Sequence, residues 1–317
     1  MSDKCTQVSD LCRVQDTVLG YYPNLGSGYF FSVAFGICLI AAVSLGVWKK
    51  TWTYTAAIAV GLILETAGYI GRILLHANPF NSGAFQLQIC AIILAPTFIC
   101  VSIYLTLKHV SFNLNPSLSR IPPAWYPRIF LPADLTCLII QGIGGGIAAA
   151  AKRDKPTLQR DGNRCIIAGI VLQVIVLGGF GYLGTDYFIR ARRHFRSGAA
   201  TQDELALWTD RKFRKFVFAV GGAYVAMLVR CIYRIAEMAG GWGNHIMQDE
   251  PSFLVLDSTL ILVTVYLLTI FHPGIFFPQM ANGYAKRNKV GVSDAEVKAN
   301  ETTSGSSSDG HKTESSH

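Results

Sequence analysis

Charged side chains at regular spacing lie inside the apolar parts of this sequence. Arg230, Arg234 and Glu237 are spaced i, i+4 and i+7, so they share one face of a helix. Glu65 and Arg72 are seven residues apart, which also places them on one face. Arginine can grip a phosphate or a carboxylate with two parallel hydrogen bonds, and a carboxylate can receive an amine. This chemistry is that of a polar pocket that accepts a charged head group.

Seven long apolar stretches hold these residues. They cover residues 28–47, 53–75, 86–107, 129–150, 165–189, 216–239 and 253–277. Each is close to the ~20 residues that a helix needs to cross the hydrocarbon core of a bilayer. Charged residues make up only 15% of the chain, against roughly 25% in an ordinary soluble domain. The sequence therefore predicts an all-α integral membrane protein, a bundle of seven transmembrane helices.

Polar residues inside these stretches form the candidate site. An ionisable side chain at bilayer depth costs on the order of 2.5–3.5 kcal/mol, so it usually faces the bundle interior and serves function. The candidate substrate-binding residues are Glu65, Arg72, Asp134, Gln141, Gln173, Arg230, Arg234, Glu237 and Asp257. Three arginines face four carboxylates here, so the same residues could instead pair with one another and stabilise the bundle. The sequence leaves both interpretations open.

Basic residues in the connecting segments predict the orientation. With the N-terminus outside, the cytosolic segments up to residue 297 carry 16 Lys and Arg and the outer segments carry seven, although a basic loop at 152–164 lies outside. We therefore predict an extracellular N-terminal segment (1–27), a transmembrane domain (28–277) and a cytosolic tail (278–317). The tail has almost no large apolar residues to offset the entropy of ordering, so we expect it to be largely disordered.

This orientation gathers five of the charges in the outer half of the bundle: Arg72, Arg230, Arg234, Glu237 and Asp257. Glu65 lies near mid-membrane, which makes it the candidate for a proton-linked step. Cys5 and Cys12 would both lie outside the cell, where they can form a disulfide. The long loops are 109–127 and 190–215. Glycine clusters in the fourth and fifth stretches predict close approach of helix backbones: Gly142, Gly144–Gly146, Gly178, Gly179, Gly181 and Gly184.

Several different short motifs are spread along the chain from Tyr21 to Gly274. In order they are Glu65-x-x-Gly68-Tyr69-x-x-Arg72; Gln88, Ala95-Pro96 and Tyr104; Phe130, Asp134, Gln141 and Gly144–Gly146; Gly169 and Gln173; Arg230-x-x-Tyr233-Arg234-x-x-Glu237 with Gly240, Glu250 and Asp257; and His272-Pro273-Gly274. This pattern resembles the fungal lipid-translocating exporter family, which includes aminocholesterol-resistance, sphingoid-base-exporting and protoporphyrin-handling proteins. The sequence departs from the family pattern at Asn24, Gly28 and Leu254.

The resemblance implies a multi-pass plasma-membrane protein that translocates amphipathic lipids, such as sphingoid long-chain bases, or confers resistance to toxic amphiphiles. Its partners are then the lipid bilayer and amphipathic small molecules. We expect no nucleic-acid partner, because the basic residues lie in loops where they set the orientation. We also expect no cofactor, no metal and no catalytic residue.

Two other functions share parts of the pattern. A seven-helix receptor or sensor for a lipid-like ligand would use the same span count and an outward-facing pocket. However, the third stretch ends in Leu107-Lys108-His109, without an acidic–arginine pair. An intramembrane hydrolase would need several metal ligands at one depth, yet only His272 among the histidines is clearly within a stretch. No Gly-x-x-x-x-Gly-Lys-Ser/Thr loop is present for ATP hydrolysis by that route. The sequence therefore favours a transporter.

Overall fold

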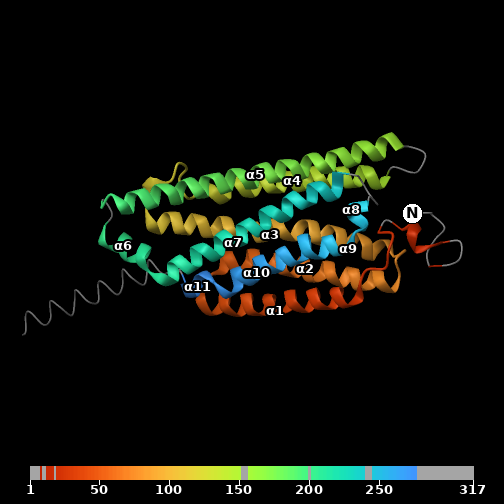
Figure 1. Ribbon diagram of the computed structural model, residues 1–317, viewed down its shortest axis with the longest axis horizontal. Helices are drawn as coiled ribbons and strands as arrows, with labels where there is room; N and C mark the ends of the chain where they lie inside the picture. Colours follow the sequence, from red (N-terminus) through yellow and green to blue (C-terminus); the bar gives the residue numbers. More distant parts are fainter. Residues whose placement is uncertain are drawn as a thin grey trace, which may run out of the picture.

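The computed structural model is a bundle of long helices that run side by side along one axis (Figure 1). The structure describes residues 8, 12–17, 19–150, 156–198, 201–239 and 245–276. Within these ranges seven helical segments are long and apolar enough to cross a membrane. The predicted seven-helix membrane fold is therefore confirmed.

The first three spans form one side of the bundle. They are α1 (Leu25–Lys49), α2 (Trp52–Ala77) and α3 (Ser82–Leu114), and α2 packs along both of the others. Asn24 and Asn81 precede α1 and α3, and each side chain accepts a hydrogen bond from a backbone N–H in the first turn. Asparagine is among the best residues at this capping position, so the sequence itself defines where these two helices begin.

The fourth and fifth spans, α4 (Trp125–Ala150) and α5 (Pro156–Arg196), pack closely against each other. With 41 residues, α5 is far longer than the hydrocarbon core requires. Its start at Pro156 corrects the prediction of a loop over 152–164, since most of that segment is helical. Proline fits the first helical turn because its missing N–H has no partner there. The polar residues at the start of α5 lie outside the apolar stretch, but they still belong to the helix.

The sixth and seventh spans complete the bundle, and α10 packs on α7. The sixth is α7 (Arg211–Ala239). The seventh consists of four consecutive pieces: α9 (Glu250–Phe253), the π-helical turn η3 (Leu254–Thr259), α10 (Leu260–Ile270) and α11 (Pro273–Phe276). A π-helical turn holds one more residue than an α-helical turn, and such turns are found mostly at functional sites. The turn η3 therefore shifts the helical register of the seventh span, so that the residues on its two sides face different directions.

The two predicted long loops are shorter than expected. α3 continues to Leu114 and is followed by the 3₁₀ turn η2 (Pro116–Leu118). α5 continues to Arg196, and the short helix α6 (Gln202–Thr209) lies between α5 and α7. Basic residues in the last turn of α5 interact favourably with the helix dipole, so they extend this helix rather than break it.

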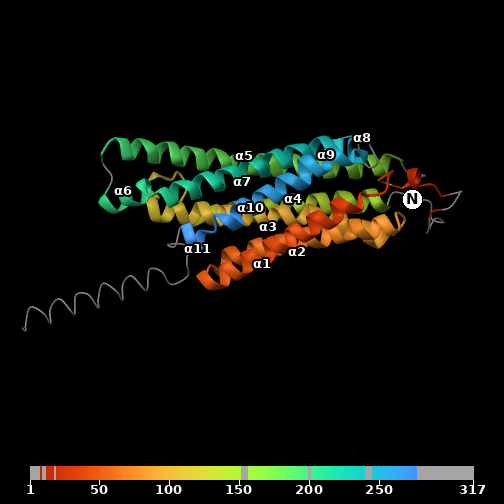
Figure 2. The same cartoon turned by 60° about the horizontal axis from the view of Figure 1, so that its bottom comes forward.

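The two ends of the bundle differ in what they carry. The 3₁₀ turn η1 (Val14–Asp16), the short helix α8 (His245–Gln248) and α9 lie at one end, which we call the N-terminal end (Figures 1 and 2). α6 and α11 lie at the opposite end.

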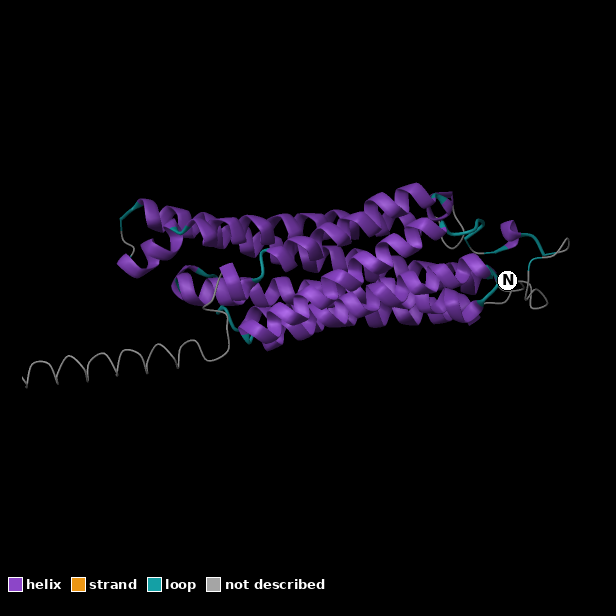
Figure 3. Cartoon of the chain, turned by 90° about the horizontal axis from the view of Figure 1, so that it is seen from below, coloured by secondary structure: helices purple, strands orange, loops and turns teal. Residues whose placement is uncertain are grey.

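The long sides of the bundle are helical throughout (Figure 3). Large apolar side chains point outward along them, with Ile40 70% and Phe218 76% exposed. Such exposure suits a surface that faces lipid rather than water.

Some predictions concern residues outside the described ranges. These are the tail 278–317, Gly240 of the sixth-span motif, and Cys5. Cys12 is a disulfide cysteine. Its pairing with Cys5 stays a prediction, as do the disorder of the tail and the outside location of the N-terminus.

Candidate functional site

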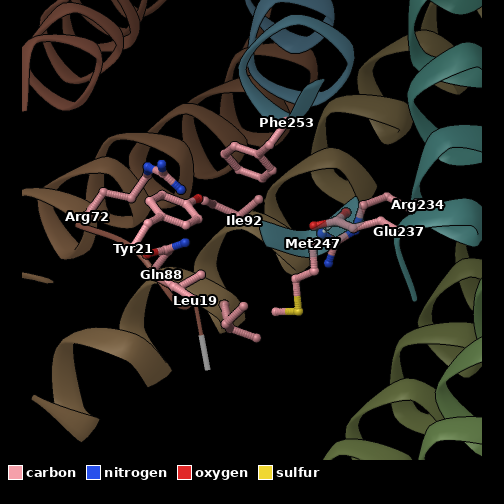
Figure 4. A pocket seen from close by; sticks show the side chains of 10 residues that line it. Leu19, Tyr21, Arg72, Gln88, Ile92, Arg234, Glu237, Met247 and Phe253 are labelled. Carbon is pink, nitrogen blue, oxygen red and sulfur yellow. Dashed lines mark hydrogen bonds and ion pairs between the residues drawn. The ribbon is translucent and has the colours of Figure 1, made fainter. Parts of the chain in front are cut away.

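A polar cavity lies at the N-terminal end of the bundle. We call it the first pocket; it encloses about 340 Å³, including space open to the outside. Figure 4 shows Arg72 and Tyr21 on one side of it, with Arg234 and Glu237 on the opposite side. The complete lining is Leu19, Tyr21, Arg72, Gln88, Ile89, Ile92, Arg234, Glu237, Met247 and Phe253. The first pocket thus has two charged walls joined by apolar side chains.

The first charged wall is built around Arg72 of α2. Its guanidinium forms an ion pair with Glu250 of α9, with Nη2 and Oε1 2.5 Å apart, and lies 4.8 Å from the ring centre of Phe253. The same Glu250 oxygen accepts a hydrogen bond from the backbone N–H of Asn24, at 2.8 Å. One carboxylate therefore ties together the second span, the seventh span and the start of the first.

The segment before α1 closes over this wall. The Pro23 carbonyl oxygen lies 2.8 Å from Nδ1 of His76, near the end of α2. The Tyr21 ring lies beside Arg72 in the first pocket (Figure 4). Burial raises the pKa of the Tyr21 phenol, and the Arg72 guanidinium opposes that shift. Tyr21 therefore presents a neutral hydroxyl to the first pocket at physiological pH.

The second charged wall belongs to α7. Arg234 and Glu237, three residues apart, form an ion pair with Nη1 and Oε2 2.6 Å apart. Arg234 also lines a second pocket of about 260 Å³ between α3, α4, α5 and α7. The lining of this second pocket is Ile93, Gln141, Ile170, Gln173, Arg230, Cys231 and Arg234. Arg234 is therefore shared by both pockets.

Two glutamines form the polar side of the second pocket. The Gln141 amide of α4 donates to the Gln173 oxygen of α5 at 3.1 Å, and the Gln173 amide donates to the Thr97 hydroxyl of α3 at 3.5 Å. Both amides are neutral groups that donate and accept hydrogen bonds. They suit hydroxyl groups of a ligand better than they suit a full charge.

Arg230 links the second pocket to the seventh span. Its Nε lies 2.7 Å from Oδ1 of Asp257, and its Nη2 donates to the Ile92 carbonyl oxygen at 3.0 Å. Asp257 belongs to the π-helical turn η3 and is fully buried. The pair is placed where the seventh span departs from α-helical geometry.

Asp134 and Glu65 occupy different places. Asp134 accepts a hydrogen bond from the Tyr104 hydroxyl at 2.7 Å, within an aromatic group that includes Phe130 and Phe180. Glu65 is fully buried, and neither carboxylate oxygen has a hydrogen-bond partner in the described part of the chain. Like Asp257, these two acids line neither of the two pockets.

The structure thus divides the nine predicted site residues. Six of them line the pockets: Arg72, Gln141, Gln173, Arg230, Arg234 and Glu237. Asp134, Asp257 and Glu65 line neither of the two pockets. Each of the three predicted arginines has a carboxylate partner, but the partner of Arg72 is Glu250, which lies outside the predicted set. The arginine of each of the three ion pairs lines a pocket, so pairing and pocket formation use the same side chains.

Glu250, Tyr21 and Gln88 are the main residues that the candidate set missed. Glu250 and Gln88 appeared in the motifs only, and Tyr21 only as their starting point. A signal for Glu250 was present, because it precedes Asp257 by seven residues and so lies two turns away along the same span. Nothing in the sequence indicated that Tyr21 reaches Arg72, since that contact depends on how the N-terminal segment folds back.

Comparisons with known proteins agree on one family. The family described as RTA1 like protein matches residues 58–280. The chain is 31% identical over 283 residues (81% of this chain and 74% of the relative) to the sphingoid long-chain base transporter RSB1 of Saccharomyces cerevisiae. It is 26% identical over 221 residues (68% and 67%) to protoporphyrin uptake protein 1 of Saccharomyces cerevisiae. It is 23% identical over 263 residues (82% and 79%) to the lipid-translocating exporter-like protein RTA1 of Ajellomyces capsulatus. No solved structure gives a significant match.

The family match begins within α2 and extends past α11, so it includes the ion pairs of α2, α7 and the seventh span. It covers more than half of the chain and agrees with the seven membrane-spanning helices. This chain is therefore a multi-pass membrane protein that belongs to the RTA1-like family.

Proposed function

We propose that this protein exports amphipathic lipids, such as sphingoid long-chain bases, across the plasma membrane. Its relatives are named as a sphingoid long-chain base transporter and a lipid-translocating exporter. The single observation that carries the proposal is Arg234, which lines two polar pockets in succession. A head group can pass from one pocket to the other while it keeps contact with the same side chain.

The pockets suit the head group and not the hydrocarbon chain. Both pockets are small, and their volumes of about 340 and 260 Å³ include space open to the outside. The amine of a long-chain base would approach Glu237 or Glu250, and its hydroxyls would approach the amides of Gln141 and Gln173. The hydrocarbon chain would lie along the apolar outer faces of the spans, where it stays in contact with lipid.

The proposal assigns no catalytic residue, because moving a lipid makes and breaks no covalent bond. With the N-terminus outside, the first pocket opens toward the outer leaflet, which is the side where an exporter releases its substrate. Membrane lipids and amphipathic small molecules are then the partners, and the plasma membrane is the site of action.

The proposal is tested by efflux of a labelled sphingoid base from cells with and without the protein. We expect Arg234→Ala to reduce efflux at least about tenfold, because one hydrogen bond to a charged group contributes about 1.5–3 kcal/mol. Arg234→Lys keeps the charge but loses the planar fork, so we expect an intermediate rate. Arg164→Ala is the control, since Arg164 is 72% exposed.

Surface expression and elution as a single species must be shown for each variant. The proposal is wrong if the wild-type protein does not change efflux, or if folded Arg234→Ala exports at the normal rate. Ligand-dependent coupling to a cytosolic protein without any flux would instead favour the receptor or sensor function.

A further inference from the structure

Glu65 is a fully buried acid at the centre of the bundle. It is the fourteenth of the 26 residues of α2, so it lies halfway along this span. Its side chain is 0% exposed, and both carboxylate oxygens lack a hydrogen-bond partner among the described residues. It lines neither pocket. The substrate-binding role predicted for Glu65 therefore does not fit its position, and another role is needed.

The charged groups around Glu65 come from two other spans. Asp257 of η3, and Arg230 and Arg234 of α7, lie within electrostatic range of it. Arg230 is already paired with Asp257, and Arg234 with Glu237. No arginine is therefore left for Glu65 in this described part of the bundle.

Among the described residues, α1 and α3 pack aromatic and apolar side chains against this part of α2. Tyr69, one turn along α2, has a buried hydroxyl that lies near Ser258 of η3. Its ring stacks on Phe31 of α1. α3 packs Ile92 and Ile99 against the glycines of α2 on either side of Glu65. The buried Tyr104 hydroxyl of α3 donates its hydrogen bond to Asp134.

This arrangement favours the neutral form of Glu65. An ionised carboxylate that is removed from water needs hydrogen-bond donors or a cation to offset the loss of hydration. Among the described residues Glu65 has no hydrogen-bond donor, and the two arginines in its electrostatic range are paired with other carboxylates. A protonated carboxyl group, in contrast, is neutral and needs no counter-charge. Arg230 lines the second pocket and pairs with Asp257, and both residues lie within electrostatic range of Glu65, so a change in that ion pair alters the field at Glu65.

We propose that Glu65 is a proton-binding site and that lipid export is coupled to its protonation; the coupling rests on the proposed function. A cationic head group in the pockets favours the ionised form of Glu65, because opposite charges attract. The O–H bond of the carboxyl group then breaks, the electron pair stays on the carboxylate, and the proton passes to water. When the lipid leaves, a proton from the opposite side of the membrane binds again. Proton and cationic lipid therefore exchange in opposite directions.

Infrared difference spectroscopy tests the proton site without any lipid. The purified full-length protein at neutral pH should show the carbonyl band of a buried protonated carboxyl group. That band should be lost in Glu65→Gln and kept in Asp161→Asn, which changes a carboxyl group that is 65% exposed. Glutamine has the shape of protonated glutamic acid, so Glu65→Gln should fold as well as the wild type. Failure of this variant to fold, or an unchanged band, overturns the proton site.

Flux in proteoliposomes tests the coupling. A pH difference of about one unit should drive about tenfold accumulation of a labelled sphingoid base by the wild type, if one proton exchanges for one lipid. A protonophore should abolish this accumulation. Glu65→Gln should still equilibrate the lipid across the membrane but should show no response to the gradient.

The outcomes separate the two proposals. Wild-type flux that ignores the pH gradient, or a gradient response that persists in Glu65→Gln, overturns the coupling but leaves lipid export standing. No lipid flux under any condition contradicts the proposed function and the coupling with it. The infrared band then still decides whether Glu65 holds a proton.

Discussion

The Arg72–Glu250 pair places two opposite charges in a nearly dry position, with the Arg72 side chain 1% and the Glu250 side chain 16% exposed. Removing charges from water costs free energy, which the pair recovers only through close contact and further hydrogen bonds. Glu250 has such a bond from the backbone N–H of Asn24. Glu250 therefore connects α2, the seventh span and the start of α1 beside the first pocket.

We expect Glu250→Gln to destabilise the protein by about 3 kcal/mol, because it leaves the buried Arg72 without a counter-charge. The double variant Arg72→Met/Glu250→Gln should recover part of that loss, since no uncompensated charge remains. Thermal unfolding in detergent measures both. Asp161→Asn is the matched control at an exposed ion pair, with an expected change of less than about 1 kcal/mol. A double variant no more stable than Glu250→Gln would contradict this account.

At the level of helices, small residues determine which spans approach closely. A Cβ atom on Gly144 of α4 would lie 2.7 Å from the carbonyl oxygen of Gly162 in α5, which is backbone and cannot move aside easily. The neighbouring Gly145 has nothing within 4 Å of such an atom. The glycine clusters predicted from the sequence therefore contain both contact positions and positions that face away from other helices. Gly144 is the position that lets α4 approach α5, whereas Gly181 meets Tyr224 of α7 and Gly184 meets Leu107 of α3.

The two glycines give a matched pair of variants. We expect Gly144→Ala to destabilise the bundle by about 1–3 kcal/mol, because the added methyl group forces α4 and α5 apart. Gly145→Ala should be neutral or slightly stabilising, since alanine is favoured over glycine in a helix by about 1 kcal/mol. Thermal unfolding of the two purified variants, together with lipid efflux, measures the effect. Equal effects of the two substitutions would show that the α4–α5 contact does not depend on Gly144.

For the whole molecule, the distribution of basic residues between the two ends of the bundle bears on its orientation in the membrane. The fold places the first pocket and the start of α5 at the N-terminal end, and the basic end of α5 at the opposite end (Figure 1). Arg160 and Arg164 belong to the first turns of α5 and not to a loop. The larger group of basic residues between 190 and 215 is at the α6 end, which favours that end as cytosolic.

Cysteine labelling tests this orientation. A membrane-impermeant maleimide should label Arg164→Cys on intact cells, and Ser197→Cys only after the membrane is permeabilised. The unaltered protein, with its native cysteines, provides the baseline. The reverse labelling pattern would place the first pocket on the cytosolic side and would turn the proposed exporter into an uptake protein.

The number of spans, the class of the fold and most of the polar residues of the pockets followed from the sequence alone. Apolar length is a local property, and a charge inside an apolar stretch must turn toward the interior whatever its partners are. Helix ends followed less well, because proline, capping residues and the helix dipole extend α3 and α5 beyond their apolar stretches. The hydropathy of the sequence does not reveal the effects of proline, capping residues or the helix dipole on where a helix ends.

Only the tertiary structure decided which charge meets which. Arg72 could have paired with Glu65 on its own helix, yet it pairs with Glu250, which is 178 residues away. The partner of each charge depends on the distances and rotations between helices. Contacts such as that at Gly144 and the π-helical turn at Asp257 determine these distances and rotations. They are properties of the assembled bundle, and spacing within one helix cannot supply them. The unpaired Glu65 is the consequence, because the other spans give each arginine a different partner.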